Sequence, residues 1–98
     1  GGSAALVTGG VQEVSITVRG NGYTASVTTI KRGIPVRLKL ITDNTNGCAR
    51  AFTIPEFSIS KVLPVTGTEI IEFTPAKAGR LAYSCSMGMY TGAFTVED

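Results

Sequence analysis

The chain has 98 residues, of which 43% are hydrophobic and 16% charged, so it has room for a single core and is predicted to form one folded domain. Its formal net charge of +2 is scattered along the chain, and no apolar run approaches the roughly 18 residues that a membrane span needs. The composition therefore predicts a soluble chain that does not bind nucleic acid. Histidine is absent, which removes the usual general base of Ser-His and Cys-His catalysis, so we predict that the protein is not an enzyme.

The first ten residues, GGSAALVTGG, are mostly glycine and other small residues. This composition is typical of a linker or a cloning remnant rather than of a packed element. The predicted domain therefore comprises residues 11–98. A linker at this point leaves open that the native protein has further domains or a membrane anchor.

Alternation of apolar and polar residues predicts seven short strands in the rest of the chain. Arg37 and Lys39 lie between the apolar positions of one run and are expected to form a solvated face. The stretch from Pro55 to Pro64 is the least regular, and we expect a long loop with a short strand there. Period two over short runs separated by Gly and Pro is typical of an antiparallel sandwich or barrel. The alternating apolar positions are Val14, Ile16 and Val18; Tyr23, Ala25 and Val27; Ile34, Val36, Leu38 and Leu40; Phe52 and Ile54; Ile71 and Phe73; Leu81, Tyr83 and Cys85; Phe94 and Val96.

The two cysteines, Cys48 and Cys85, both fall where a predicted strand meets a loop. Cys85 continues an inward-facing run and is expected to point inward at the end of its strand. Cys48 follows a turn-rich stretch and precedes the strand of Phe52, so the two cysteines could meet. Three interpretations remain open: two buried free thiols, a structural disulfide that adds roughly 4 kcal/mol by closing a loop of about 37 residues, or two thiolate ligands of a soft metal.

Both methionines of the chain, Met87 and Met89, lie in the glycine-containing loop that follows Cys85. They are either a hydrophobic lid over one end of the sandwich or a pair of thioether donors. Thiolate and thioether ligands together favour Cu(I). In an extended loop, the spacing Cys-x-Met-x-Met places the three side chains on one side. The loop sequence therefore suggests a Cu(I) site.

Residues near this loop could surround such an ion. Two thiolates on one Cu(I) leave a net negative charge, and Arg50 is either a nearby cation that offsets it or an ordinary solvated side chain. Tyr90 could help to form an apolar shell that keeps water and oxidants away from the metal. Phe52 and Tyr83 could contribute to the same shell, but we expect them in the core.

Four segments together resemble the cupredoxins, and the resemblance covers about residues 11 to 97. It implies an all-β, cupredoxin-like Greek-key sandwich (barrel) of about seven to eight strands. Blue-copper members use two histidines, a cysteine and a methionine, whereas this chain has Cys48, Met87 and Met89 at the histidine positions, which argues against blue-copper electron transfer. The segments are GIPVRL (33–38), GCARAFTIPEF (47–57), IEFTP (71–75) and AGRLAYSC (78–85).

The segments GCARAFTIPEF and YSCSMGMYTG most resemble the cupredoxin-like domains of CupA-type bacterial copper chaperones. That resemblance implies one or two Cu(I) ions bound by Cys48, Cys85, Met87 and Met89. It implies transfer of copper to an export ATPase of the P type, to its metal-binding domain or to a fused transporter domain, in the service of copper resistance. It also implies a bacterial membrane-associated protein, with the cytoplasmic face favoured over the extracytoplasmic one. The alternative is a structural or interaction β-sandwich with a Cys48–Cys85 disulfide and no metal.

Overall fold

A computed structural model describes residues 4–98 of the chain as ten strands and two single-turn 3₁₀ helices. The predicted all-β class is confirmed. The strand number exceeds the expected seven to eight because three short strands, at residues 7–8, 29–31 and 59–62, lie outside the alternating runs. The elements are β1 (Val7–Thr8), β2 (Val11–Arg19), β3 (Gly22–Ala25), β4 (Thr29–Lys31), β5 (Val36–Thr42), η1 (Cys48–Arg50), β6 (Ala51–Ile54), η2 (Pro55–Phe57), β7 (Ile59–Val62), β8 (Gly67–Phe73), β9 (Gly79–Cys85) and β10 (Thr91–Glu97).

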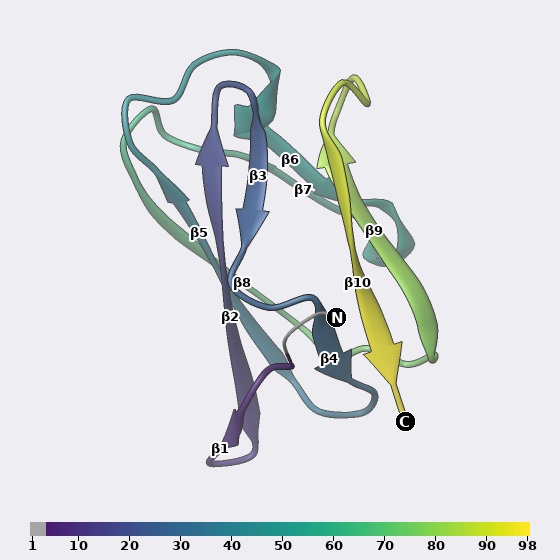
Figure 1. Ribbon diagram of the computed structural model, residues 1–98. Helices are drawn as coiled ribbons and strands as arrows, with labels where there is room; N and C mark the ends of the chain where they lie inside the picture. The colour runs from purple at the N-terminus through teal and green to yellow at the C-terminus, as the bar shows by residue number, and fades with distance from the viewer. Residues whose placement is uncertain (1–3) are drawn as a thin grey trace.

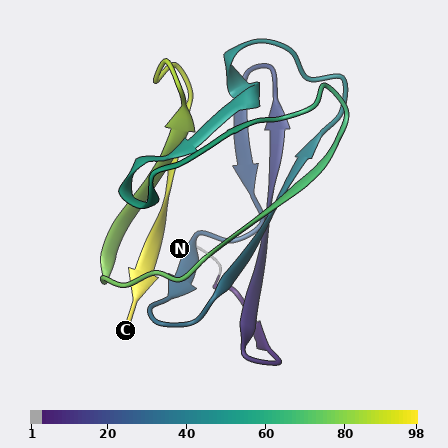
Figure 2. The same ribbon diagram turned by 180° about the vertical axis from the view of Figure 1, so that it is seen from behind.

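The strands form two facing sheets (Figures 1 and 2). One sheet has the order β1-β2-β5-β8, with β3 also paired to β2, and the other has the order β4-β10-β9-β6-β7. The pairs β2–β5 and β4–β10 are parallel, and the other strand pairs are antiparallel. The chain crosses from the first sheet to the second between β5 and β6, and this crossing contains η1.

The core lies between the sheets and is built from the alternating positions of the strands. Apolar side chains at these positions are removed from water, which is the main favourable contribution to folding. Gln12 is the polar exception: it is fully buried, its Nε2 donates to the carbonyls of Lys31 (2.8 Å) and Ile34 (2.9 Å), and its Oε1 accepts from Lys31 N–H (2.9 Å). Its buried polar atoms are thus satisfied, as buried amides need to be. The predicted positions found buried are Val14, Ile16, Val18, Val36, Leu38, Leu40, Phe52, Ile54, Ile71, Phe73, Leu81, Tyr83, Cys85, Phe94 and Val96.

The predicted linker comprises residues 1–10; its first three residues lie outside the described part of the chain, whereas residues 4–10 pack against the sandwich. Ala5 is buried in the core, and its N–H donates to the carbonyl of Thr29 at 2.9 Å. The short strand β1 pairs with the start of β2. A strand of two residues has no visible alternation, so the sequence pattern did not reveal it.

The irregular stretch from Pro55 to Pro64 contains η2 and the short strand β7, as expected. Strand β7 pairs with β6 and forms one edge of its sheet. Lys61 on this edge forms an ion pair with Glu69 of β8, with Nζ and Oε2 3.7 Å apart. Since β8 is the edge of the other sheet, this ion pair connects the two sheets across the open side of the sandwich.

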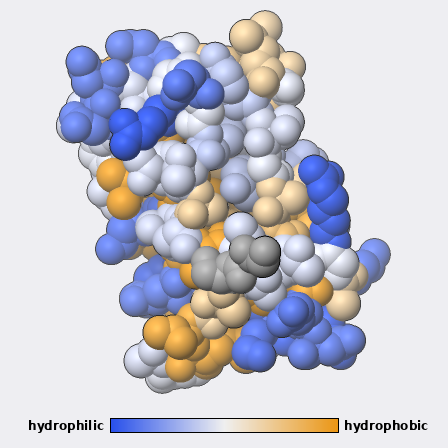
Figure 3. Space-filling model, viewed as in Figure 1, coloured by the Kyte–Doolittle hydropathy of each residue, from blue (hydrophilic) through white to orange (hydrophobic). Residues whose placement is uncertain are grey.

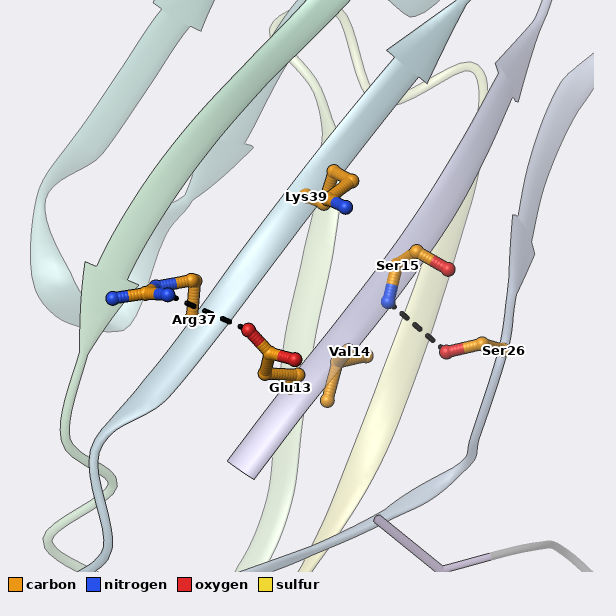
Figure 4. A pocket seen from close by; sticks show the side chains of 6 residues that line it. All are labelled: Glu13, Val14, Ser15, Ser26, Arg37 and Lys39. Atoms are coloured by element: carbon orange, nitrogen blue, oxygen red, sulfur yellow. Dashed lines mark hydrogen bonds and ion pairs between the residues drawn. The ribbon is translucent and has the colours of Figure 1, made fainter. Parts of the chain in front are cut away.

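The outer face of β2 and β5 carries the predicted solvated cations. Figure 4 shows Arg37 and Lys39 beside a shallow groove, with Glu13 next to Arg37. Arg37 lies 3.5 Å from a carboxylate oxygen of Glu13 and 3.7 Å from one of Glu72. Exposed ion pairs of this kind contribute little to stability, but they offset the local positive charge.

Gly92 of β10 provides a test of this packing. A Cβ atom at Gly92 would lie 2.5 Å from Cζ of the buried Tyr83 ring, so Gly92→Ala must displace core side chains. We expect it to lower the free energy of unfolding by about 1–3 kcal/mol, measured by urea denaturation.

Gly20→Ala is the matched control for that variant. A Cβ atom at Gly20 would meet only the Asn46 carbonyl, at 3.5 Å, which is an ordinary contact. Its stability should equal or slightly exceed that of the parent chain, because alanine restricts the unfolded state. Equal stabilities of the two variants would contradict the packing described for Gly92.

Candidate metal centre

Helix η1 and the loop between β9 and β10 lie at the same end of the sandwich (Figures 1 and 2). The antiparallel pairing of β6 with β9 places these segments together, because Phe52 of β6 lies opposite Cys85 at the end of β9. The next backbone hydrogen bond runs from Ser86 N–H to the Ala51 carbonyl at 2.9 Å. The loop after β9 thus begins beside the residue that follows η1.

The structure brings Cys48 and Cys85 together as a disulfide, with their Cα atoms 5.8 Å apart and 37 positions between them in sequence. Cys85 points inward, as predicted, and is only 1% exposed. Cys48 is the first residue of η1 and is partly exposed. This proximity is required both by the disulfide interpretation and by the interpretation of two metal-binding thiolates.

The methionine loop is a tight turn rather than an extended segment. Gly88 N–H donates to the Cys85 carbonyl at 2.9 Å, and Cys85 N–H donates to the Tyr90 carbonyl at 3.0 Å. Gly88 has φ 72°, a left-handed conformation that glycine adopts without strain. The predicted alignment of Cys85, Met87 and Met89 on one side required an extended loop, and this loop is not extended.

The turn leaves Met87 and Met89 at the surface, 76% and 64% exposed. In the corner of Figure 3 where Figure 1 draws this loop, the surface is pale orange, which marks apolar residues. The backbone N–H of Met89 donates to Sγ of Cys85 at 3.2 Å. Met89 is thus in direct contact with the cysteine pair through its backbone, and its thioether lies in the open part of the site.

Two side chains hold η1 in place beneath Cys48. Arg50 donates from Nε to the Leu63 carbonyl at 2.8 Å, and its own carbonyl accepts from Leu63 N–H at 2.8 Å. Tyr23 donates from its hydroxyl to the Ala49 carbonyl at 3.0 Å. The sequence analysis missed the role of Tyr23, although a buried tyrosine usually needs a hydrogen-bond partner and this could have indicated one.

Aromatic rings form the floor under η1 and the cysteines. Tyr23 meets Phe52 edge to face at 5.6 Å between ring centroids, and Tyr83 lies 5.7 Å from Phe52 and 5.1 Å from Phe94. Phe52 and Tyr83 are core residues, as expected. Tyr90 is half-buried and packs against the hydrophobic core. The inner side of the site is therefore apolar and closed to water.

Burial in this cluster changes the acidity of two tyrosines. Desolvation first, and then the neighbouring Tyr83, raises the pKa of Tyr23 to about 12. Desolvation also raises the pKa of Tyr83. Both hydroxyls therefore stay protonated at any physiological pH, and Tyr23 remains a hydrogen-bond donor to η1.

The soft donor atoms at this end of the sandwich are the sulfurs of Cys48, Cys85, Met87 and Met89. Among residues 4–98, no three histidine, cysteine, aspartate or glutamate residues lie close enough together to hold a metal ion. Thiolates and thioethers together form a donor set that suits a soft monovalent ion such as Cu(I). The cysteines can serve only when reduced, since the thiolate is the metal-binding form.

Comparison with known proteins identifies relatives of the same size. The family described as the cupredoxin-like domain matches residues 3–96. The metal-binding domain of CopA, the Cu(I)-exporting P-type ATPase of Streptococcus pneumoniae D39, solved with Cu(I), superposes with a TM-score of 0.87 at 28% identity, covering 98% of this chain and 95% of that chain. A copper-binding protein solved by NMR in its apo form superposes with a TM-score of 0.85 at 31% identity, covering 98% of this chain and 97% of that chain. No curated protein matches the chain.

The Tyr23 hydroxyl can be tested with Tyr23→Phe, which keeps the ring and removes the bond to Ala49. At pH 8 we expect a loss of about 1 kcal/mol in the free energy of unfolding. The pKa of Tyr23 is about 12 in the folded chain and near 10 when unfolded. The unfolded state therefore loses this proton first as pH rises, so the stabilisation is complete below pH 10 and is lost progressively toward pH 12.

The Tyr23→Phe variant lacks this ionisation. The difference in free energy of unfolding between the parent chain and the variant, both with the Cys48–Cys85 disulfide intact, should therefore shrink between pH 8 and pH 11. Urea denaturation at the two pH values measures it, and each protein serves as its own reference. A difference that stays constant or grows would contradict the assigned burial of the hydroxyl.

Proposed function

Because the chain belongs to the family of cupredoxin-like domains, we propose that it binds Cu(I) through Cys48, Cys85, Met87 and Met89. The observation that carries this proposal is the meeting of Cys48 and Cys85 directly beside the exposed methionine turn. Four soft donors thus lie at one end of the fold. The CopA domain was solved with Cu(I), and the second structural relative is a copper-binding protein.

The proposed ligands combine negatively charged and neutral sulfur donors, a set that suits one or two Cu(I) ions. Reduction of the disulfide releases two anionic thiolates, and the methionines add neutral thioethers. Arg50, which ends η1, is proposed to offset the net negative charge of a Cu(I)–dithiolate unit. Tyr90 is proposed to extend the apolar wall beside the ion.

The open side of the site suits transfer of the metal. Met87 and Met89 are exposed, whereas Cys85 is buried, so a partner thiolate approaches the ion from the methionine side. We propose that the chain delivers Cu(I) to a copper-exporting P-type ATPase, to its metal-binding domain or to a transporter domain in the same protein, as part of copper resistance. The relative from Streptococcus pneumoniae is a domain of such an ATPase, which supports this assignment.

A reducing compartment fits the need for free thiols, so we favour the cytoplasmic side of a bacterial membrane-associated protein over the extracytoplasmic side. Within residues 4–98, no helix has both the length and the apolar character required to cross a bilayer. The proposed attachment to a membrane would therefore depend on a partner or on another part of the native protein.

A second candidate function is a structural or interaction sandwich without metal. The disulfide between Cys48 and Cys85 favours it, since closing a loop of 37 positions adds roughly 4 kcal/mol to stability in the loop-entropy model. In that case, the methionines are only an apolar lid. The two functions differ in whether the reduced chain retains Cu(I).

An anaerobic titration of the reduced chain with Cu(I), in competition with a chromophoric chelator, tests the proposal. We expect one or two Cu(I) ions per chain. Cys85→Ser should weaken binding by at least about tenfold, or about 1.4 kcal/mol, because a thiolate ligand is lost. Ser86→Ala is the matched control, since it changes the exposed neighbour of Cys85 and should keep full affinity. Full affinity in Cys85→Ser would exclude the thiolate site.

Met87→Leu and Met89→Leu separate a ligand from a lid, because leucine keeps the apolar bulk and lacks the thioether. We expect weaker Cu(I) binding in both variants. If two ions bind in unequal steps, Met89→Leu should weaken one step more than the other. A lid needs only apolar bulk, so unchanged stepwise affinities in both variants would assign the methionines to the lid.

A further inference from the structure

We propose that Cys48 is a site of thiol–disulfide exchange with low-molecular-weight disulfides, that Cys85 resolves the mixed disulfide, and that closure of the pair switches off metal binding. The part that concerns copper rests on the proposed function. The exchange chemistry stands on the geometry of the cysteine pair alone.

The backbone already holds the pair at disulfide spacing. The Cα atoms are 5.8 Å apart, inside the usual range of about 4.4–6.8 Å for this bond. Cys85 is fixed by hydrogen bonds on both sides of the strand end, from its own N–H to Tyr90 and from Ser86 N–H to Ala51. The closed bond is therefore compatible with the strand pairing of the sandwich.

The two cysteine residues differ in their exposure to solvent. Cys85 is 1% exposed and lies above the aromatic floor, whereas Cys48 is partly exposed and follows the exposed Gly47. Exchange proceeds by attack of a thiolate on one sulfur while the other sulfur leaves, so access determines which sulfur is attacked. An external thiolate reaches Cys48, and Cys85 is the leaving group.

The surroundings of Cys85 favour that role. The backbone N–H of Met89 lies 3.2 Å from Sγ of Cys85 and donates to it. Hydrogen bonds to a charged acceptor are stronger than those to a neutral one, so this contact strengthens as Cys85 becomes a thiolate. A better-stabilised leaving thiolate departs faster.

A low-molecular-weight disulfide, RSSR, is the only oxidant that closure of the Cys48–Cys85 pair requires. The Cys48 thiolate attacks one sulfur of a disulfide RSSR, which forms the Cys48–SR bond and releases RS⁻. The Cys85 thiolate then attacks Sγ of Cys48, which forms the Cys48–Cys85 bond and releases a second RS⁻. In total, two protein thiols are oxidised and RSSR is reduced to two thiols; reductive opening follows the reverse path.

Closure removes the charged donors of the proposed metal site. Sulfurs joined in a disulfide supply no thiolate, and only the neutral thioethers of Met87 and Met89 remain. Both methionines are exposed to solvent in the disulfide-bonded structure. The redox state of the pair thereby controls copper binding.

The test treats the reduced chain anaerobically with glutathione disulfide, quenches samples with acid and maps adducts by peptide mass spectrometry. We expect the internal disulfide as the final product and a transient glutathione adduct on the peptide that contains Cys48. An adduct found mainly on Cys85, or a pair that glutathione disulfide fails to close, would overturn the proposal.

Two single variants isolate the roles. Cys85→Ser lacks the resolving thiol and should accumulate one glutathione on Cys48. Cys48→Ser leaves only the buried thiol and should react at least about tenfold more slowly when folded. Misfolding of a variant would expose Cys85, so the rate of glutathione addition to each folded variant is compared with the rate for the same variant unfolded in urea. The adduct map of the parent chain is independent of both variants. Equal rates in the two folded variants contradict the assignment.

A chelator competition with Cu(I) then compares the reduced and the glutathione-oxidised chain. We expect at least about a tenfold loss of affinity, or about 1.4 kcal/mol, on oxidation. If exchange occurs but both forms bind Cu(I) equally, both the switch and the proposed thiolate ligands are wrong. If the reduced chain binds Cu(I) but no exchange occurs, the proposed function stands and this inference fails.

Discussion

The pairing of β6 with β9 is the constraint on which the candidate site depends. Strand β6 starts directly after η1, and its Phe52 lies opposite Cys85, so Cys48 is only a short turn away from Cys85. Thr53 strengthens this pairing, since its hydroxyl donates to the Ser84 carbonyl at 3.1 Å. A register slip of one residue would turn Cys85 to the outer face of the sheet and separate the sulfurs.

The same pairing gives the site one closed side and one open side. Inward alternation along β9 places Cys85 over the buried rings of Phe52 and Tyr83. The strand then ends in a turn that needs the left-handed Gly88, and this turn moves the following residues out of the alternating pattern. Met87 and Met89 therefore lie in solvent although Cys85 is buried. A buried sulfur-containing residue and two exposed ones thus lie within residues 85–89.

Most of the sandwich could be predicted from the sequence because period two marks every strand long enough to show it. The inward position of Cys85 followed from the same rule. The pattern did not show that residues 4–10 join the fold, since β1 has only two residues and Ala5 is a small residue outside any alternating run. It also missed the buried Gln12, because a polar residue at an inward position interrupts the apolar alternation. Long-range hydrogen bonds to Lys31 and Ile34 make that position favourable.

The site was predictable in its residues but not in its shape. Spacing alone could not show that a bond from Gly88 to Cys85 curls the methionine loop. Nor could it distinguish the disulfide from a thiolate pair, because both interpretations require Cys48 and Cys85 to lie close together. The structure has them joined, with their Cα atoms 5.8 Å apart. The two cysteines are also unequally exposed, and this favours Cys48 over Cys85 as the first point of attack from solvent.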